Sequence, residues 1–402
     1  MGPEITVLMP VYNASEFLKC AIESILNQTF TNFEFLIIDD GSTDNSLEII
    51  KSIQDERIKV ITHTKNLGLV ATLNKGIEQA KGQFIARMDA DDIALPTRLE
   101  KQYAFMSSNC DYGVCGTWLK VIGSEEIYNY PTDHEQITAS LLFYCALGHP
   151  TVMLRKAILD KKCIRYNNVY AEDYDLWVRL SRITKLYNVP EVLLEYRIHD
   201  SEYRFSNQHR TKQMMATVKI REDQLRYLGV KTTECDLEIH HSIGDNNFIY
   251  NEKFIEKLKM WITKIQQVSN YKTPYRKMIE KIESSINKEI QDITKILLEI
   301  QNKVNNHKLY VWGTGSQAEK DIILLNEFKI PIKNFIDSNY SKRGKYFYNK
   351  KILSPVDIND EDNAIFIISS MYYKIIEKEI LKMGFQEKNI YKLKNNNTLI
   401  FY

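Results

Sequence analysis

Residues 84–92 read Phe-Ile-Ala-Arg-Met-Asp-Ala-Asp-Asp, a largely apolar stretch that runs directly into three carboxylates. The first five residues have the length of a buried strand, and the acids follow where that strand must end. Upstream, Ile5–Met9, Phe33–Ile38 and Arg57–Thr62 have the same character, and amphipathic helical patterns separate them. Strands that alternate with helices predict an α/β layer fold for the first 200 residues.

Polar residues gather where these predicted strands end, at Pro10–Asn13, Asp39–Asp44 and Asp89–Asp92. Ligands bind at this edge of an open α/β sheet, because loops and helix N-termini converge there. Asp89 and Asp91 can both approach one hard divalent cation through oxygen ligands. An Asp-x-Asp pair alone is a weak signal, since acid pairs are common in exposed turns.

The same residues also admit a purely structural interpretation. The side chain of Asn13 is suited to cap the next helix, with Glu16 three residues later completing a capping box. The Asp39–Asp44 stretch is typical of a turn whose last acid caps a helix. Asn66-Leu-Gly68 is equally compatible with an ordinary turn.

Composition narrows the class of protein. The 402 residues are enough for two to three domains. With 53 basic and 52 acidic residues the net charge is +1, which excludes a broad nucleic-acid footprint. The six cysteines form no Cys-x-x-Cys pair, as expected for reduced cytosolic thiols. No signal peptide is visible, and Gly148-His-Pro150 interrupts the longest uncharged stretch, so we expect a cytoplasmic protein with at most peripheral association at the inner membrane face.

The pattern divides the chain into an α/β domain at 1–204, a helical segment at 205–307 and a small Rossmann-like α/β domain at 308–402. In the helical segment isoleucines recur every seven residues from Ile279 to Ile300. This ladder predicts either a seam between two copies of the chain or a helix packed on its own neighbours. Glu289 interrupts the ladder and favours the second interpretation.

A glycine-rich turn opens the last domain. Gly313-x-Gly315-x-x-Ala318 follows the predicted strand Leu309–Trp312 and opens a helix. Asp337 lies 22 residues after Gly315, near the spacing expected for the ribose-binding acid of a dinucleotide fold. The turn therefore predicts either nucleotide binding or a module for packing and assembly.

Five short motifs of the first half occur together in one order. They are Pro10-Val-Tyr-Asn13, Ile38-Asp-Asp-Gly-Ser-Thr-Asp44, Asn66-Leu-Gly68, Met88-Asp-Ala-Asp-Asp92 and Glu172-Asp-Tyr-Asp-Leu-Trp177. In order and spacing they resemble the family 2 glycosyltransferases, whose nucleotide-sugar-binding architecture is called GT-A. The resemblance extends from Ile5 to about His199, half of the chain, and the last domain resembles modules attached to bacterial surface-polysaccharide enzymes.

The resemblance implies a nucleotide-sugar site at the predicted sheet edge. Its expected donor-binding residues are Pro10, Val11, Tyr12, Asn13, Asp39, Asp40, Asn66, Arg87, Asp89 and Asp91. Asp39 or Asp40 would read the base, typically uracil, and Arg87 could reach a phosphate. Asp89 would lie near the ribose and diphosphate, and Asp91 nearest to a Mn²⁺ or Mg²⁺ ion. His199 is a further candidate metal ligand, or a contact of the diphosphate together with Arg197.

Glu172 and Asp173 match the motif whose aspartate is the usual catalytic base of an inverting transferase. A base must take the proton of the acceptor hydroxyl as that oxygen attacks the anomeric carbon. Asp173 is the first choice, with Glu172 and Asp175 as alternates. The competing interpretation is an acidic helix N-terminus stabilised by the helix dipole. Trp177 is expected to lie in the core because of its helical spacing from the acids.

These features predict a metal-dependent inverting hexosyltransferase that moves a sugar from a nucleoside-diphosphate sugar, typically a UDP-sugar, to a saccharide. The resemblance implies a bacterial capsule or surface-glycan setting, with a lipid-linked saccharide as one form of the acceptor. The alternative is a nucleotide-sugar- or dinucleotide-binding protein whose C-terminal module carries the function. His149 is expected either to contact a sugar or to serve as a structural histidine.

Overall fold

The computed structural model describes residues 2–198, 209–245, 247–248, 252–267, 273–358, 363–370 and 372–393. The chain forms two compact units, the first made of 1–245 with 268–278 and the second of 246–267 with 279–401. The domain boundaries at 204 and 307 stay a prediction.

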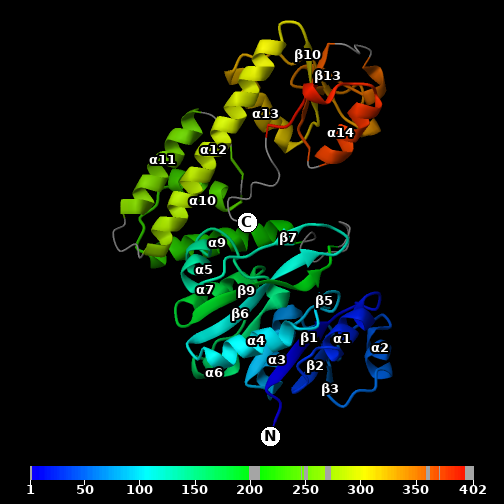
Figure 1. Ribbon diagram of the computed structural model, residues 1–402, viewed down its shortest axis with the longest axis vertical. Helices are drawn as coiled ribbons and strands as arrows, with labels where there is room; N and C mark the ends of the chain where they lie inside the picture. The colour runs from blue at the N-terminus through cyan, green and yellow to red at the C-terminus, as the bar shows by residue number, and fades with distance from the viewer. Residues whose placement is uncertain are drawn as a thin grey trace. The chain divides into compact units, whose positions relative to one another are not determined.

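A nine-stranded sheet forms the centre of the first unit in the described residues, in the order β3-β2-β1-β4-β8-β6-β9-β5, with β7 paired to β6 (Figure 1). The strands are β1 Ile5–Val11, β2 Phe33–Asp39, β3 Ile58–Thr62, β4 Phe84–Arg87, β5 Ile93–Ala94, β6 Tyr112–Val121, β7 Ile127–Tyr128, β8 Met153–Arg155 and β9 Lys185–Tyr196. β3, β2, β1 and β4 are mutually parallel, and β8 is antiparallel to β4. The α/β prediction is confirmed.

The helices of this unit are α1 Leu18–Leu26, α2 Ser46–Ser52, α3 Leu69–Gln79, α4 Arg98–Ser108, α5 His134–Ser140, α6 Lys156–Lys161, α7 Glu172–Ser181, α9 Arg210–Tyr227 and α10 Glu234–Gly244, with a 3₁₀ turn at His149–Thr151. Side chains of a strand alternate between the two faces. Val7 and Met9 of β1 therefore pack in one core with α1 and α4, while Leu8 lies against Gly76 of α3 on the other face. Trp177 is fully buried in α7, as predicted.

The strand order creates a switch point in the sheet. β2 and β3 lie on one side of β1, and the chain crosses after β3 to place β4 on the other side. In doubly wound sheets this switch point leaves a crevice at the carboxyl ends of the strands. The loops after β1, β2 and β4 end at this crevice.

A six-stranded sheet in the order β12-β13-β11-β10-β14-β15 forms the C-terminal part of the second unit, among its described residues. Its elements are β10 Lys308–Trp312, α13 Ser316–Glu327, β11 Asn334–Ile336, β12 Tyr346–Phe347, β13 Lys350–Leu353, β14 Ala364–Ile368, α14 Tyr373–Lys382 and β15 Ile390–Tyr391, with 3₁₀ turns at Tyr340–Lys342, Pro355–Asp357 and Glu387–Asn389. Five of its strands are parallel and only β12 is antiparallel. The sheet with its helices confirms the predicted α/β class of the last domain.

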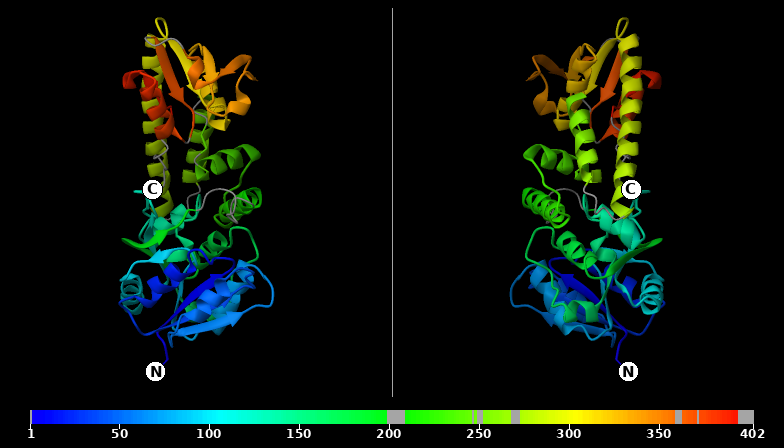
Figure 2. Two further views of the ribbon diagram at one scale, coloured as in Figure 1. Left: turned by 90° about the vertical axis from the view of Figure 1, so that its right-hand side faces the viewer. Right: turned by 90° about the vertical axis from the view of Figure 1, so that its left-hand side faces the viewer.

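Two long helices, α11 Glu252–Gln267 and α12 Thr273–Lys303, run beside each other in both sets of views (Figures 1 and 2). The isoleucine ladder lies on α12, and Ile279, Ile286, Ile293 and Ile300 are all buried within the chain. This burial supports packing inside the chain, so association of two copies through the ladder stays a prediction with less support. None of the described helices is both long enough and apolar enough to cross a bilayer.

Candidate active site

The loops that follow β1 and β2 are joined by side-chain hydrogen bonds. Asn13 has a φ of +49°, and its Oδ1 accepts from the Thr43 backbone N–H at 2.8 Å. Helix α1 instead begins at Leu18 after Phe17, so the predicted capping box of Asn13 and Glu16 is wrong. Asn13 does not cap the helix because the chain makes a further turn before α1. It holds the two loops together.

The expected first nucleotide loop has two kinds of residue. Pro10 and Val11 are buried within β1, so their side chains belong to the core. Tyr12 is 48% exposed, and Asn13 is exposed as well. Only the second pair therefore presents side chains at the sheet edge. Asp44 anchors the neighbouring loop: burial raises its pKa, but hydrogen bonds from Ser46 and Ser15 outweigh this and lower the pKa to about 2.

Asp39 and Asp40 are adjacent and buried, yet their carboxylates have different partners. Asp40 accepts from the backbone N–H groups of Leu67 and Gly68, each at 2.9 Å, and faces His63 Nδ1 at 2.8 Å. Asp40 therefore fixes the loop that carries the exposed Asn66. For Asp39 the hydrogen bond found is a long one of 3.4 Å from the Ser42 N–H. The structure thus separates two acids that the sequence left equivalent.

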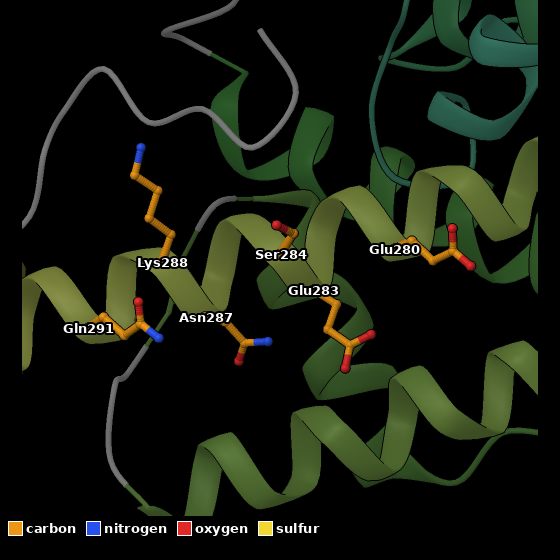
Figure 3. Close-up of a pocket in the computed structure, with 6 residues that line it drawn as sticks. All are labelled: Glu280, Glu283, Ser284, Asn287, Lys288 and Gln291. Atoms are coloured by element: carbon orange, nitrogen blue, oxygen red, sulfur yellow. The ribbon is translucent and has the colours of Figure 1, made fainter.

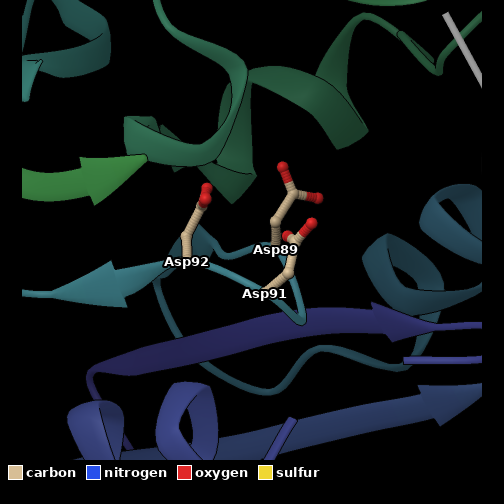
Figure 4. A group of neighbouring side chains, drawn as sticks. All are labelled: Asp89, Asp91 and Asp92. Atoms are coloured by element: carbon tan, nitrogen blue, oxygen red, sulfur yellow. The ribbon is translucent and has the colours of Figure 1, made fainter. Parts of the chain in front are cut away.

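Three carboxylates, those of Asp89, Asp91 and Asp92, gather after β4 and point to the same side of the loop (Figure 4). One ligand atom from each lies within 4.8 Å of the others, a spacing that one cation can bridge. Asp92 is fully buried, and its Oδ2 makes no hydrogen bond in the described part of the chain. Burial raises the pKa of Asp92 well above its ordinary value, and the negative charges of Asp89 and Asp91 add to this. The cluster fits a divalent cation, which would relieve this repulsion.

Arg87 is the last residue of β4 and is almost fully buried. Its two terminal nitrogens contact the two carboxylate oxygens of Asp89 in a fork. Burial disfavours the charged guanidinium, but the attraction of Asp89 outweighs it and raises the pKa of Arg87. Arg87 therefore orients Asp89 and balances its charge in the structure.

Arg197, at the end of β9, closes the other side of the cluster. Its backbone N–H donates to Asp92 Oδ1 and its Nε to the Asp91 carbonyl, both at 2.9 Å. Its guanidinium carbon stands 3.9 Å from the centre of the Phe17 ring. The predicted metal ligand His199 follows two residues later and lies outside the described residues.

Glu172 and Asp173 begin helix α7, as the sequence predicts. Both are partly buried, and desolvation raises both pKa values, that of Glu172 to about 7 with a further contribution from Asp173. The positive charge of Arg87 acts on both acids in the opposite direction. Arg87 is thus electrostatically coupled to the acid cluster after β4 and to the acid pair of α7.

Buried polar side chains support this acid pair. His149 Nε2 lies 2.9 Å from the Tyr166 hydroxyl, and its Nδ1 lies 3.8 Å from Glu172 Oε1. Burial lowers the pKa of His149 well below its ordinary value, which keeps the ring neutral. Cys145 Sγ lies 3.6 Å from Asp173 Oδ2.

Asp175 faces elsewhere. Its Oδ2 accepts from Arg179 Nη2 at 2.7 Å and from Asn167 Nδ2 at 2.9 Å. These bonds give it a structural role within α7.

Sequence reasoning did not name Asp92, Tyr166 or Cys145 as site residues. Asp92 belongs to the recognised motif Met88-Asp-Ala-Asp-Asp92, so the sequence contained enough information to name its carboxylate as a candidate ligand. Tyr166 gave no local signal, because Asn74, 92 residues earlier, holds its backbone through two hydrogen bonds of 2.9 Å. Such a pair exists only in the folded chain.

A cavity of about 440 Å³ in the second unit is unrelated to this chemistry (Figure 3). Its lining side chains all come from the single helix α12: Glu280, Glu283, Ser284, Asn287, Lys288 and Gln291. Its lining residues do not form an acid cluster like the one that follows β4.

The fold and the acid cluster define an α/β protein with a nucleotide site at the switch point of its sheet. Residues 6–170 match the model of Glycosyl transferase family 2, and residues 305–391 match C2185-like, N-terminal. An uncharacterized glycosyltransferase of Haemophilus influenzae is 32% identical over 273 residues, which cover 64% of this chain and 84% of that protein. An O-antigen biosynthesis glycosyltransferase of Escherichia coli is 36% identical over 209 residues, with coverage of 49% and 80%.

A third relative is the Escherichia coli UDP-Glc:alpha-D-GlcNAc-diphosphoundecaprenol beta-1,3-glucosyltransferase, 31% identical over 200 residues, with coverage of 49% of this chain and 78% of that protein. The chain belongs to glycosyltransferase family 2, with a GT-A domain at its N-terminus. It is a nucleotide-sugar glycosyltransferase. The description of the model that residues 305–391 match states no activity.

Proposed function

We propose that this enzyme transfers a sugar from a UDP-sugar to a saccharide acceptor with inversion, that the reaction requires a divalent metal, and that Asp173 is the general base. The observation that carries the proposal is the geometry of two acid groups: ligand oxygens of Asp89, Asp91 and Asp92 lie within 4.8 Å of one another, and the partly buried Glu172 and Asp173 begin α7. One group suits a cation and a diphosphate, and the other suits proton removal from an acceptor. An inverting transfer needs both.

The metal site would consist of Asp91 with Asp89 and Asp92. All three offer the hard oxygen ligands that Mn²⁺ and Mg²⁺ accept. When bound, such an ion stabilises negative charge on a departing diphosphate. Arg87 contacts both carboxylate oxygens of Asp89, so its guanidinium balances part of the negative charge of the cluster. His199 stays a predicted additional ligand.

The donor nucleotide would lie along the loops after β1 and β2. Asp39 is the proposed reader of the base, since Asp40 is occupied by the loop of residues 63–68. The exposed ring of Tyr12 offers a flat apolar surface for the base. Asn13 and Asn66 are exposed amides at the same edge and complete the proposed donor contacts.

Three features support Asp173 as the base. Its carboxylate is partly buried and held beside Cys145 Sγ, and desolvation raises its pKa towards the working range of a base. Glu172 Oε1 lies 3.8 Å from His149 Nδ1, beyond hydrogen-bond distance, and Asp175 is bound by Arg179 and Asn167. In this scheme Asp173 takes the acceptor proton, while Glu172 tunes the charge of the pair.

The named relatives suggest the setting. One acts in O-antigen biosynthesis, and the name of another gives a diphosphoundecaprenol-linked sugar as its acceptor. We extend this to the present enzyme as synthesis of a bacterial surface polysaccharide on a lipid-linked acceptor. The reaction would then take place at the inner face of the cell membrane, with the enzyme peripherally attached.

The test is a nucleotide-release assay with UDP-, GDP-, CDP- and dTDP-sugars in Mn²⁺, Mg²⁺ or EDTA. We expect release of UDP that requires metal and falls at least 100-fold in Asp91→Asn, while the exposed acid variant Glu48→Gln keeps full activity. Asp173→Asn should lose transfer to an added acceptor but keep UDP binding. Equal release in EDTA would contradict the metal requirement, and full transfer by Asp173→Asn would contradict the base.

The alternative of a pure binding protein has lost its support, because the family assignment establishes an enzyme. A binding function is now an open question only for the C-terminal domain.

A further inference from the structure

A cavity of about 750 Å³ lies in the C-terminal sheet domain, far larger than a single side chain needs. It opens at the carboxyl ends of β10, β11 and β14, where the parallel order β11-β10-β14 has its own switch point. Its volume lies within the range of small-molecule sites. All of its lining residues belong to the second unit, so it is separate from the nucleotide-sugar site.

Gly313 forms the floor of the cavity and has a φ of +121°. A Cβ atom there would come within 2.5 Å of the Ser369 carbonyl oxygen. Only glycine therefore lets the loops after β10 and β14 approach so closely. The same approach leaves the first turn of α13 facing the cavity.

One end of the cavity suits a phosphate. Gly315 is the N-cap of the twelve-residue helix α13, and no side chain caps this helix in the described structure. Ser316 and Gln317 of the first turn line the cavity, and the N–H groups of a first turn have no partner within the helix. Lys342 lines the cavity too; its Nζ pairs with Asp337 Oδ2 at 2.8 Å and donates to the Thr314 hydroxyl, so Asp337 balances its charge.

Asp337, the residue with the spacing of a ribose-binding acid, is already engaged. Its Oδ2 accepts from Lys342 Nζ at 2.8 Å and from the Thr314 hydroxyl. Its Oδ1 accepts from the Asn339 N–H at 2.9 Å. These bonds lower the pKa of Asp337 against the opposing effect of burial. Asp337 therefore fixes the glycine-rich turn and Lys342, and does not bind ribose as in a dinucleotide site.

The start of α14 also lines the cavity, through Tyr372, Ile375 and Ile376. Tyr372 is 62% exposed and Ile375 is 66% exposed, although both are large and largely apolar. Such residues at the mouth of a cavity are typical of a binding surface. Glu379, one turn beyond Ile375, adds a half-buried carboxylate that can accept hydrogen bonds from hydroxyl groups.

We propose that this cavity binds a nucleoside phosphate, with the phosphate at the N-terminus of α13 and Lys342, the base against Tyr372 and Ile375, and the ribose hydroxyls towards Glu379. Because Asp337 balances the charge of Lys342, the phosphate would be held by the N-terminus of α13 and by the third N–H donor of the Lys342 ammonium. The exposed apolar wall requires a flat, weakly polar group, and inorganic phosphate alone would leave it uncovered. This second site is independent of the transfer reaction proposed above.

Calorimetric titration of the full chain tests the proposal with UMP, UDP, AMP, ADP, NAD⁺ and inorganic phosphate as probes. The double variant Asp39→Asn/Asp91→Asn weakens the donor site, so binding that persists in it and falls when Gly315→Asp is added belongs to the second unit. Gly315→Asp places a negative charge at the phosphate end. A Cβ at Gly315 meets nothing within 4 Å, so this variant and its neutral control Gly315→Ala should both fold.

We expect the double variant to bind at least one mononucleotide with one-to-one stoichiometry. Gly315→Asp should weaken this binding at least tenfold and Lys342→Met several-fold, with Gly315→Ala close to the parent. Tyr372→Ala should weaken nucleotide binding while leaving inorganic phosphate binding unchanged.

Absence of binding to the double variant at millimolar concentrations, or binding that ignores Gly315→Asp and Lys342→Met, would overturn the site. NAD⁺ binding tenfold tighter than every mononucleotide would overturn the role assigned to Asp337. Inorganic phosphate binding as tightly as the nucleotides would overturn the role of Tyr372. Loss of sugar transfer in Asp91→Asn alone leaves these readouts untouched, so failure of one proposal is distinguishable from failure of the other.

Discussion

Replacing Asp40 by asparagine should destabilise the first unit without removing a donor contact, while the same change at Asp39 should do the reverse. Asp40 accepts from Leu67 N, Gly68 N and His63 Nδ1 at 2.8 to 2.9 Å, and its side chain is almost fully buried. Asparagine keeps one oxygen and turns an N–H₂ group towards one of these donors. One charged-acceptor bond is lost, and one buried N–H is left unpaired, at a cost of about 3 kcal/mol.

That cost corresponds to a fall in Tm of about 8 °C for a unit of this size. Asp39→Asn removes only the charge behind a 3.4 Å contact from Ser42 and keeps an oxygen in place. We expect a Tm within about 2 °C of the parent, because a long bond of this kind contributes little. If Asp39 reads the base, UDP affinity should fall about tenfold, equivalent to about 1.4 kcal/mol.

Thermal unfolding followed by circular dichroism measures the first quantity, and UDP titration at 20 °C measures the second. The two variants serve as matched controls because the substitution is the same and the two adjacent residues are both buried. The reasoning is refuted if Asp40→Asn keeps the parent Tm and loses UDP binding, while Asp39→Asn binds UDP normally.

Three further outcomes follow from the site. The raised pKa values of Glu172 and Asp173 keep these acids protonated at lower pH, so kcat/KM should fall as the pH drops below about 7. Glu172→Gln should move this fall in kcat/KM to lower pH. A rate that does not depend on pH between about 5.5 and 8 would contradict the assignment of the base. Tyr166→Phe should leave His149 Nε2 without its partner and lower the free energy of unfolding in urea by about 1 to 3 kcal/mol. The transfer rate should fall as well. An unchanged rate would show that the acid pair does not need the hydrogen bond between Tyr166 and His149. Gly41→Ala should destabilise the fold by more than about 2 kcal/mol, because the φ of Gly41 is +71° and a Cβ there would lie 2.6 Å from the Lys65 carbonyl carbon. Gly68→Ala should cost only about 1 kcal/mol, because Gly68 has a φ of +91° but open space around it. Equal costs of the two variants in thermal unfolding would exclude the steric argument.

The strands and the acidic strand ends were predictable because they depend on local pattern. Phe84–Arg87 forms β4 within one residue of the predicted range, and the predicted strand Leu309–Trp312 lies within β10. Glu172 starts α7 at the residue where the acidic motif begins. In each case the apolar run and its polar end are adjacent in sequence, so no distant residue is needed to place them.

The details of the site were less accessible because distant residues decide them. Asn13 was expected to cap α1 but is bound by Thr43, 30 residues away. Asp92 faces inward because the backbone of Arg197, 105 residues later, donates to it. Residues this far apart in the chain leave no periodic pattern in the sequence.

The sequence by itself determined the α/β class, the order of the acidic motifs and their resemblance to family 2 glycosyltransferases. It could do so because hydrophobic periodicity and turn chemistry act over a few residues. Only the tertiary structure separated Asp39 from Asp40, and Asp175 from its two acidic neighbours. Each of these carboxylates has the same local chemistry, and their roles differ through buried hydrogen bonds and ion pairs that form only when remote segments pack together.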